Sequence, residues 1–251
     1  MIGAPFYVMD EVAGRVVRDV DELRSFTDTE AVAVTHDLVD VLARLHSLDP
    51  AAVGLADFGR PEGFLARNLA RWGKQWDANR TRDLPQVDEL ARRLAQALPT
   101  SGPSAIVHGD YRLENTMLHP TEPRIVAVLD WEMSTLGDPL TDLGLFIVYW
   151  QQWGDGGVLS TGGASALPGF PGLDAIVARY GATTGRDLAA LDFYVVFAFY
   201  KLAIILEGIN ARFRMGLTVG DGFDRMGDAV TTLLDAALGV ADASDIAALR
   251  G

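Results

Sequence analysis

The chain has 251 residues and a formal net charge of −13, with 49% hydrophobic and 22% charged residues. This balance is typical of a folded globular protein and excludes a disordered chain. Such an acidic surface repels nucleic-acid phosphates and no Lys/Arg run offsets it, so we expect no nucleic-acid partner. The absence of cysteine excludes disulfides, thiolate nucleophiles and Cys-ligated zinc.

The sequence offers no obvious membrane or export signal. The first residues lack the basic end and apolar core of a signal peptide. The longest apolar stretch, residues 193–209, is interrupted by Lys201 and Glu207. A buried helix explains it better than a membrane span, so we expect a cytoplasmic protein without a membrane partner.

Helical periodicity dominates the first hundred residues. A short β-type run at residues 6–9 is followed by a turn at Ala13-Gly14. A long helix is predicted to begin with Asp28 or Thr29 as its cap and to end at residues 49–50. Two more helices are expected at residues 61–76 and 87–98.

The middle of the chain changes to a strand pattern. Residues 105–107 form one expected strand, and residues 116–119 and 124–129 form a β-hairpin around the turn at 120–123. A helix follows from Asp138-Pro139, then a loop at 154–172 that its Gly, Ser and Pro content predicts to be flexible. The last helices are expected at residues 173–183, 189–215 and 223–238. The predicted fold class is therefore α+β, mostly helical with one small hairpin.

One motif carries a specific chemistry. His108-Gly109-Asp110 is followed by Asn115 and, after the second hairpin strand, by Asp130. This matches the spacing H-x-D-x-x-x-x-N with a later metal-binding Asp, as in phosphoryl-transfer sites. Asp110 is the predicted catalytic base, and Asn115 and Asp130 are the predicted Mg²⁺ ligands. A turn cap at Asp110 or a strand end at Asp130 are alternatives, but neither explains all three residues.

Residues around the motif have expected supporting roles. His108 is expected to hold the loop by hydrogen bonds rather than act as a base. Asp138 and Asp142 are expected to cap a helix and tie the loop backbone. Arg112 either faces a phosphate or the substrate or pairs with a carboxylate, and the sequence leaves these alternatives open. A last group, on residues 193–200, is an aromatic set expected in the core: Phe193, Tyr194, Phe197, Phe199 and Tyr200.

These residues resemble a known family. HGDYRLEN at 108–115, VLDWE at 128–132 and LGDPLTDL at 136–143 are similar to the signature of the aminoglycoside phosphotransferase (APH/choline-kinase-like) family. The residues HPTEP at 119–123 and WEMST at 131–135 most resemble the branch of this family that is associated with acyl-CoA dehydrogenases. The resemblance covers the chain from about residue 5 to its end.

The resemblance implies a protein-kinase-like C-terminal lobe at residues 15–251 that uses Mg²⁺ and ATP or GTP to phosphorylate a small-molecule hydroxyl. Residues 1–14 look like the interlobe hinge, where the backbone of Asp10 and Val12 would hold adenine. Trp150, near a loop that resembles a substrate lid, and Arg112 are implied substrate contacts. Antibiotic, sugar, choline-like and hydroxyacyl-CoA acceptors all stay open.

The sequence departs from the family pattern at its start. No Gly-rich loop with a strand Lys precedes the hinge, and the chain's two lysines, Lys74 and Lys201, lie in predicted helices. We therefore expect this chain to form the C-terminal lobe alone and to have weak or no phosphotransferase activity. We also expect its apolar hinge end to associate with a second copy. A non-catalytic kinase-like binding or regulatory module is the main alternative. Metal-assisted hydrolysis by the two Asp and the Asn is a third.

Overall fold

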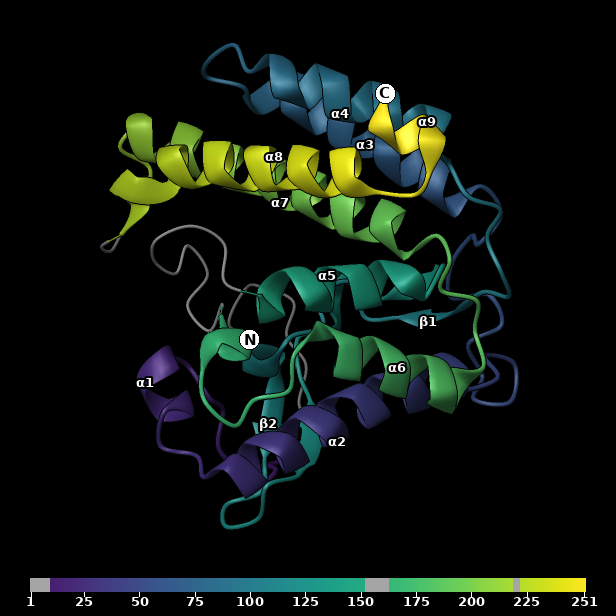
Figure 1. The fold of residues 1–251 in the computed structure, drawn as a ribbon, viewed down its shortest axis with the longest axis vertical. Coiled ribbons are helices and arrows are strands. Elements are labelled where there is room, and N and C mark those ends of the chain that lie inside the picture. Colours follow the sequence, from purple (N-terminus) through teal and green to yellow (C-terminus); the bar gives the residue numbers. More distant parts are fainter. Residues whose placement is uncertain (1–9, 152–162, 219–221) are drawn as a thin grey trace, which may run out of the picture.

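The computed structural model describes residues 10–151, 163–218 and 222–251. Its strands pair in two antiparallel ribbons, β1 with β4 and β2 with β3, and helices make up most of the rest (Figure 1). The strands are β1 (Ala105–Val107), β2 (Thr116–Leu118), β3 (Ile125–Val128) and β4 (Thr135–Gly137). The helices are α1 (Val20–Leu23), α2 (Asp28–Ser47), α3 (Phe64–Asn79), α4 (Pro85–Gln96), α5 (Leu140–Trp150), α6 (Leu173–Thr184), α7 (Leu191–Arg214), α8 (Met226–Ala243) and α9 (Ala247–Arg250). The α+β class predicted from the sequence is confirmed.

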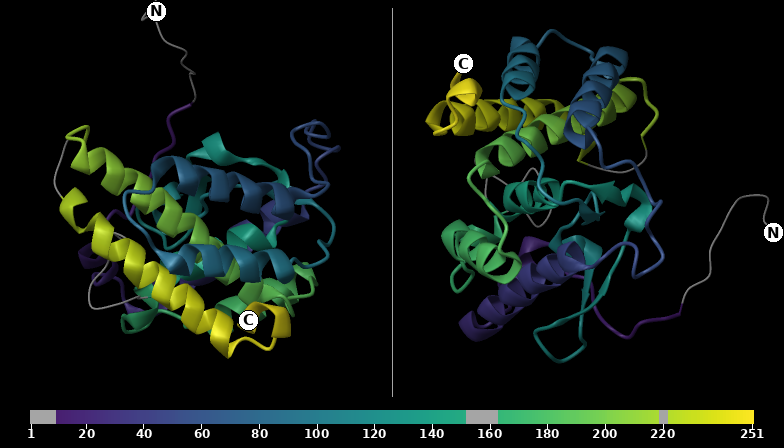
Figure 2. Two further views of the ribbon diagram at one scale, coloured as in Figure 1. Left: turned by 90° about the horizontal axis from the view of Figure 1, so that it is seen from above. Right: turned by 90° about the vertical axis from the view of Figure 1, so that its right-hand side faces the viewer.

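The helices form two layers on either side of α5. Helices α3, α4, α7, α8 and α9 pack together on one side, and α2 and α6 pack on the other with the strand pairs (Figure 1). In both views of Figure 2 the blue helices α3 and α4 lie beside the green and yellow helices α7 and α8. Helix α5 therefore belongs to the interior of the molecule and contacts α7 along its length.

A capping box starts the long helix α2. The Thr27 backbone N–H donates to Glu30 Oε2 at 2.9 Å, and the Glu30 N–H donates to Thr27 Oγ1 at 3.3 Å. These bonds satisfy two N–H groups that the first helical turn leaves free. The sequence had indicated Asp28 or Thr29 as the cap; that prediction was one or two residues late, because the cap is set by the reciprocal Thr–Glu pair rather than by an isolated Asp.

The predicted β-hairpin is present and is tied to α2. Ile125 of β3 donates its backbone N–H to Asp37 Oδ2 of α2 at 2.5 Å. On the other side of the hairpin, Arg15 exchanges backbone hydrogen bonds with Leu118 of β2 at 2.9 and 2.8 Å. The hairpin that follows the catalytic motif is thus fixed to a long helix and to the N-terminal segment.

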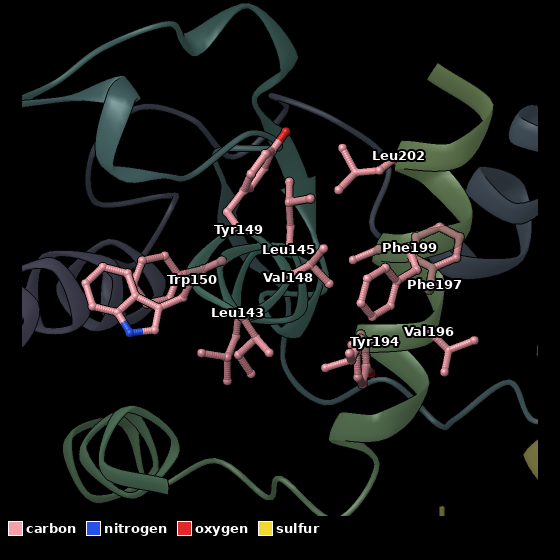
Figure 3. Close-up of a cluster of buried hydrophobic side chains, with 14 of the residues drawn as sticks. Leu143, Leu145, Val148, Tyr149, Trp150, Tyr194, Val196, Phe197, Phe199 and Leu202 are labelled. Atoms are coloured by element: carbon pink, nitrogen blue, oxygen red, sulfur yellow. The ribbon is translucent and has the colours of Figure 1, made fainter. Parts of the chain in front are cut away.

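The centre of the core lies between α5 and α7 (Figure 3). Helix α5 is buried on all sides and is apolar after its first turn, which is typical of a helix within the interior of a protein. Gly144 lets the two helices approach closely, since a Cβ there would lie 2.5 Å from the Tyr194 carbonyl oxygen. The aromatic set predicted as core is buried throughout: Phe193, Tyr194, Phe197, Phe199 and Tyr200.

Parts of the sequence-based expectations lie outside the described residues. The apolar hinge end at residues 1–9 and residues 154–162 of the loop at 154–172 belong to these parts, so the hinge at 1–14 and association through it stay predictions. Among the described helices, none combines the length and the apolar character needed to cross a bilayer.

The close contact of α5 with α7 makes a stability prediction. We expect Gly144→Ala to lower the free energy of unfolding by about 2 kcal/mol or more, because the added methyl group overlaps the Tyr194 backbone. Gly239→Ala in α8 is the matched control, since nothing lies within 4 Å of the position that its added methyl group would take. Removing that helical glycine is expected to stabilise by about 0.5–1 kcal/mol. Urea unfolding measures both, and equal effects of the two changes would contradict the packing.

Candidate active site

Strand β1 delivers the catalytic motif into the interior. All three of its residues are buried, and the chain then turns at Gly109 with φ of +86°. A Cβ on this glycine would lie 2.7 Å from the Met133 carbonyl oxygen, so both the backbone angle and the space require glycine. The turn places Asp110 at the start of a loop that ends at Asn115.

A buried carboxylate in α5 holds this turn. Asp142 Oδ2 accepts the His108 backbone N–H at 2.6 Å, and Asp142 Oδ1 accepts the Gly109 N–H at 2.8 Å. Burial by itself raises the pKa of Asp142, but the hydrogen bonds from His46 and from these two N–H groups outweigh it and lower the pKa below its usual value of 3.8. The backbone tie that the sequence predicted for Asp142 is thus present.

His46 extends the network away from the loop. Its Nε2 lies 3.2 Å from Asp142 Oδ2, and its Nδ1 lies 2.8 Å from the Tyr180 hydroxyl. In the neutral ring, Nε2–H donates to the carboxylate and Nδ1 accepts from the tyrosine. Both rings are buried, so helices α2 and α6 are linked to the motif through one histidine.

The predicted base and one predicted metal ligand are in direct contact. Asn115 Nδ2 donates to Asp110 Oδ2 and to the Asp110 carbonyl oxygen, both at 2.8 Å. With its amide N–H groups used in this way, Asn115 directs its side-chain oxygen elsewhere. That oxygen is the atom a magnesium ion would require.

Asp130 is brought beside this pair by the end of β3. The Leu129 N–H donates to the Asn115 carbonyl oxygen, and His108 Nε2–H donates to the Leu129 carbonyl oxygen, both at 2.8 Å. Asp130 itself is exposed and adopts left-handed backbone angles (φ 64°, ψ 56°), the only non-glycine with positive φ within the described ranges. Such conformations cost free energy and cluster at functional sites.

An arginine on the same loop forms ion pairs with two carboxylates. Arg112 Nη1 pairs with Glu114 at 2.5 Å, while its Nε lies 3.5 Å from Asp110 Oδ2, within ion-pair range but too long for a good hydrogen bond. Burial lowers the pKa of Arg112, but its electrostatic interactions with Tyr149, Asp110, Glu114 and Asp130 together raise it. The carboxylates of Asp110 and Asp130 therefore both act on the guanidinium group of Arg112.

Tyr149, rather than Trp150, faces the motif. The Tyr149 hydroxyl donates to Asp110 Oδ1 at 3.3 Å, and Arg112 lies 4.9 Å from its ring centre. Trp150 is 3% exposed and donates its indole N–H to the Pro171 carbonyl oxygen at 2.9 Å. The structure thus places the implied substrate contact Trp150 in the core between Phe146 and Phe170, because successive residues of a helix point about 100° apart.

The implied adenine contacts lie in the segment that leads to the hairpin. Asp10 and Val12 are exposed, in a segment without helix or strand. The segment reaches the sheet at Arg15, which pairs with Leu118 in the strand after Asn115. No bonded partner defines the role of either residue within the described part of the chain, so adenine binding stays a prediction for them.

Lys201 of α7 is a site residue that sequence reasoning missed. Its Nζ donates to the Gly109 carbonyl oxygen at 2.6 Å, one residue before Asp110. Burial lowers the pKa of this lysine, although the nearby carboxylates of Asp110 and Asp142 act in the opposite direction. The contact joins residues 92 positions apart, so local patterns could not reveal it.

Oxygen ligands are available for a divalent cation, but they are few. Two carboxylates and one amide form a hard donor set that suits Mg²⁺, which usually takes its other ligands from water and phosphates. Within the described residues, no group of three or more His, Cys, Asp or Glu is placed to hold a metal by itself. The donor set fits a metal that arrives with a nucleotide better than a permanent structural ion.

Sequence comparisons agree with the motif. The profile of the phosphotransferase enzyme family matches residues 2–176. Acyl-CoA dehydrogenase family member 11 of Gallus gallus is 37% identical to this chain over 225 residues, which covers 86% of this chain and 28% of that protein. The chain thus spans little more than a quarter of the length of that relative.

Two solved structures show the same fold. A Ralstonia eutropha protein assigned as an aminoglycoside phosphotransferase matches with a TM-score of 0.82 and 33% identity, covering 92% of this chain and 71% of that one. A choline/ethanolamine kinase family protein of Mesorhizobium loti matches with a TM-score of 0.57 and 18% identity over 95% of this chain and 72% of that one. The second likeness shows the fold alone.

The Asp142 network makes a prediction for stability. Asp142→Asn places an amide N–H₂ near backbone N–H donors, and leaving buried donors unsatisfied costs about 1–3 kcal/mol each. We therefore expect urea unfolding at pH 7 to show a loss of about 3 kcal/mol. Asp245→Asn, at an exposed position, is the control and should change stability by less than about 0.5 kcal/mol.

The pH dependence of that loss is a further check. Because folding lowers the pKa of Asp142, its contribution is present above pH 3.8 and disappears as the pH falls through the lower folded value. The difference between the parent and Asp142→Asn should shrink on acidification. A difference that grows below pH 4 would contradict the network.

Proposed function

Because this chain belongs to the phosphotransferase enzyme family and has its kinase-like fold, we propose that it binds Mg·ATP and transfers the γ-phosphoryl group to a hydroxyl of a small molecule. The single observation that carries this proposal is the hydrogen-bonded pair of Asp110 and Asn115, with Asp130 held beside it through Leu129. Three side chains suited to phosphoryl transfer thus meet in one place.

Asp110 is the proposed catalytic base. Its two carboxylate oxygens are oriented by neutral donors, Asn115 at 2.8 Å and the Tyr149 hydroxyl at 3.3 Å, and part of its surface is open to solvent. The acceptor O–H bond breaks as its oxygen forms a bond to the γ-phosphorus. The bond from that phosphorus to the bridging oxygen breaks, ADP leaves, and the proton passes to Asp110.

Asn115 and Asp130 are the proposed ligands of the metal. The amide oxygen of Asn115 is directed away from Asp110, and Asp130 is exposed at the end of β3. A bound Mg²⁺ ion would offset the negative charge of the nucleotide phosphates, which matters in a chain of net charge −13. Arg112 is the proposed phosphate or substrate contact, because it lies beside the proposed base, with its Nε 3.5 Å from Asp110 Oδ2.

ATP is the proposed donor, and the acceptor is proposed only as a small-molecule hydroxyl. We also expect slow turnover by this chain on its own, because its two lysines lie on the helices α3 and α7, whereas a kinase-like site places its phosphate-binding lysine on a strand. A kinase-like module that binds nucleotide without transfer is the alternative. Nucleotide binding and turnover must therefore be measured separately.

Metal-dependent binding gives the first functional prediction. Mg·ATP should raise the melting temperature of the parent, since a ligand that binds only the folded state stabilises it. Asp130→Ala should weaken Mg·ATP binding at least about tenfold by loss of a metal ligand, with little effect on the unliganded melting temperature. Asp245→Ala is the control. Equal Mg·ATP titrations for Asp130→Ala and the parent would show that Asp130 is no ligand.

The proposed catalytic base, Asp110, gives the second functional prediction. Basal ATP hydrolysis, in which water replaces the acceptor hydroxyl, should fall by about a hundredfold or more in Asp110→Asn, since general-base catalysis contributes about 10²–10⁴ in rate. Mg·ATP binding should stay within a few-fold of the parent. Phosphate release that is unchanged in this variant would remove Asp110 from the role. Bound nucleotide with no release from the parent would favour the non-catalytic alternative.

A further inference from the structure

Two adjoining hollows lie beside the motif, between α3 and the loop that ends in β4. The smaller holds about 80 Å³ and reaches Gly109, Asp142 and Lys201; the wider holds about 510 Å³ and opens along the exposed face of α3. They share a wall, which consists of Phe64, Asn68, Arg71, Met133 and Thr135. The combined space is of the size of small-molecule sites.

Positive charge gathers around these hollows. Arg71 and Lys201 line the smaller one and lie 5.0 and 5.8 Å from the same Trp72 ring. Arg60 and Arg67 join Arg71 along the wider one. Like charges held together raise the free energy unless an anion lies between them.

The arginines of this group have no carboxylate partner. Within the described parts of the chain, none of Arg60, Arg67 and Arg71 forms an ion pair, although other arginines do. Arg67 instead donates to the backbone carbonyls of Glu62 and Arg60. Several guanidinium groups without a carboxylate partner along one hollow are unexpected in a chain with 34 acidic and 21 basic residues.

The acidic groups near the two hollows do not neutralise the positive charge of Arg71. Asp142 lines the smaller hollow, but its oxygens accept the two backbone N–H groups and face His46. Asp110 acts on Lys201 through space, and Glu132 is an exposed residue of the wider hollow. The positive charge of Arg71 is therefore available to a ligand.

We propose that Arg71 and Lys201 bind a negatively charged oxygen group, a carboxylate or phosphate, of the acceptor molecule. This inference rests on the proposed transfer function and narrows its substrate class to hydroxyl compounds that carry an anionic group. Lys201 donates one N–H to the Gly109 carbonyl and keeps two donors for the ligand. Arg71 offers a planar fork that matches either anion, and Arg60 and Arg67 lie where a longer acceptor would extend.

Binding of simple anions tests this without an active enzyme. Inorganic phosphate and malonate are titrated by calorimetry into the whole chain, with EDTA present and potassium chloride at matched ionic strength. We expect saturable binding of at least one of them, weakened about tenfold or more in Arg71→Ala and in Lys201→Met. The stronger of the two anions identifies the group as phosphate or carboxylate.

Lys74→Met is the matched control, because it removes the other lysine of the chain from an exposed position on α3. It should bind the anions as the parent does. Arg71 is exposed, so its variant should fold even if Lys201→Met does not. Equal binding in Arg71→Ala, or equal weakening in Lys74→Met, would show an adventitious ion only and overturn the inference. Binding no stronger than that of chloride would overturn it as well.

A second titration separates this inference from the proposed function. Mg·ATP is added to the same variants after the EDTA has been removed. Retained Mg·ATP binding with no anion site would end the anion proposal and leave the nucleotide site. Anion binding that depends on Arg71, without any Mg·ATP binding, would support the subsite and end the transfer function.

Discussion

The candidate site depends on two hydrogen bonds, which the buried carboxylate of Asp142 accepts from backbone N–H groups. Asp142 stands in the first turn of α5 and holds the peptides of His108 and Gly109 at 2.6 and 2.8 Å. Because α5 is fixed by its contact with α7, the loop takes its position from the core of the molecule (Figure 3). A site built on a rigid element keeps its geometry better than a site on a free loop.

The same turn is held from its other side. Lys201 of α7 binds the Gly109 carbonyl oxygen, so this one residue is held by α5 through its N–H and by α7 through its carbonyl group. On the far side of the loop, His108 and Asn115 bind the backbone of Leu129 and bring the end of β3 to the motif. Helices α5 and α7 and the end of β3 thus fix the loop whose side chains face the nucleotide in the proposed reaction.

Sequence alone could predict what is local and could not predict what depends on packing. Asp110 and Asn115 are five residues apart on one loop, so their spacing predicts their contact, and the hairpin that brings Asp130 back was visible in its turn residues. Tyr149 and Lys201 reach the loop from 39 and 92 positions away, and His46 reaches Asp142 across 96 positions. Only the tertiary packing of their helices brings them there. Trp150 is a further example of what sequence could not predict. The apolar pattern of α5 predicts a buried helix, but it does not predict whether Tyr149 or Trp150 faces the site.

The central claim is that Asn115 and Asp130 bind one metal on a nucleotide whose γ-phosphate faces Asp110. A crystal structure of the chain with Mg²⁺ and a non-hydrolysable ATP analogue tests it most directly. The account predicts a metal ion bound by the Asn115 side-chain oxygen and the Asp130 carboxylate, with the terminal phosphate in front of Asp110. A nucleotide whose phosphates lie away from these three residues, in a chain otherwise folded as described, would contradict it.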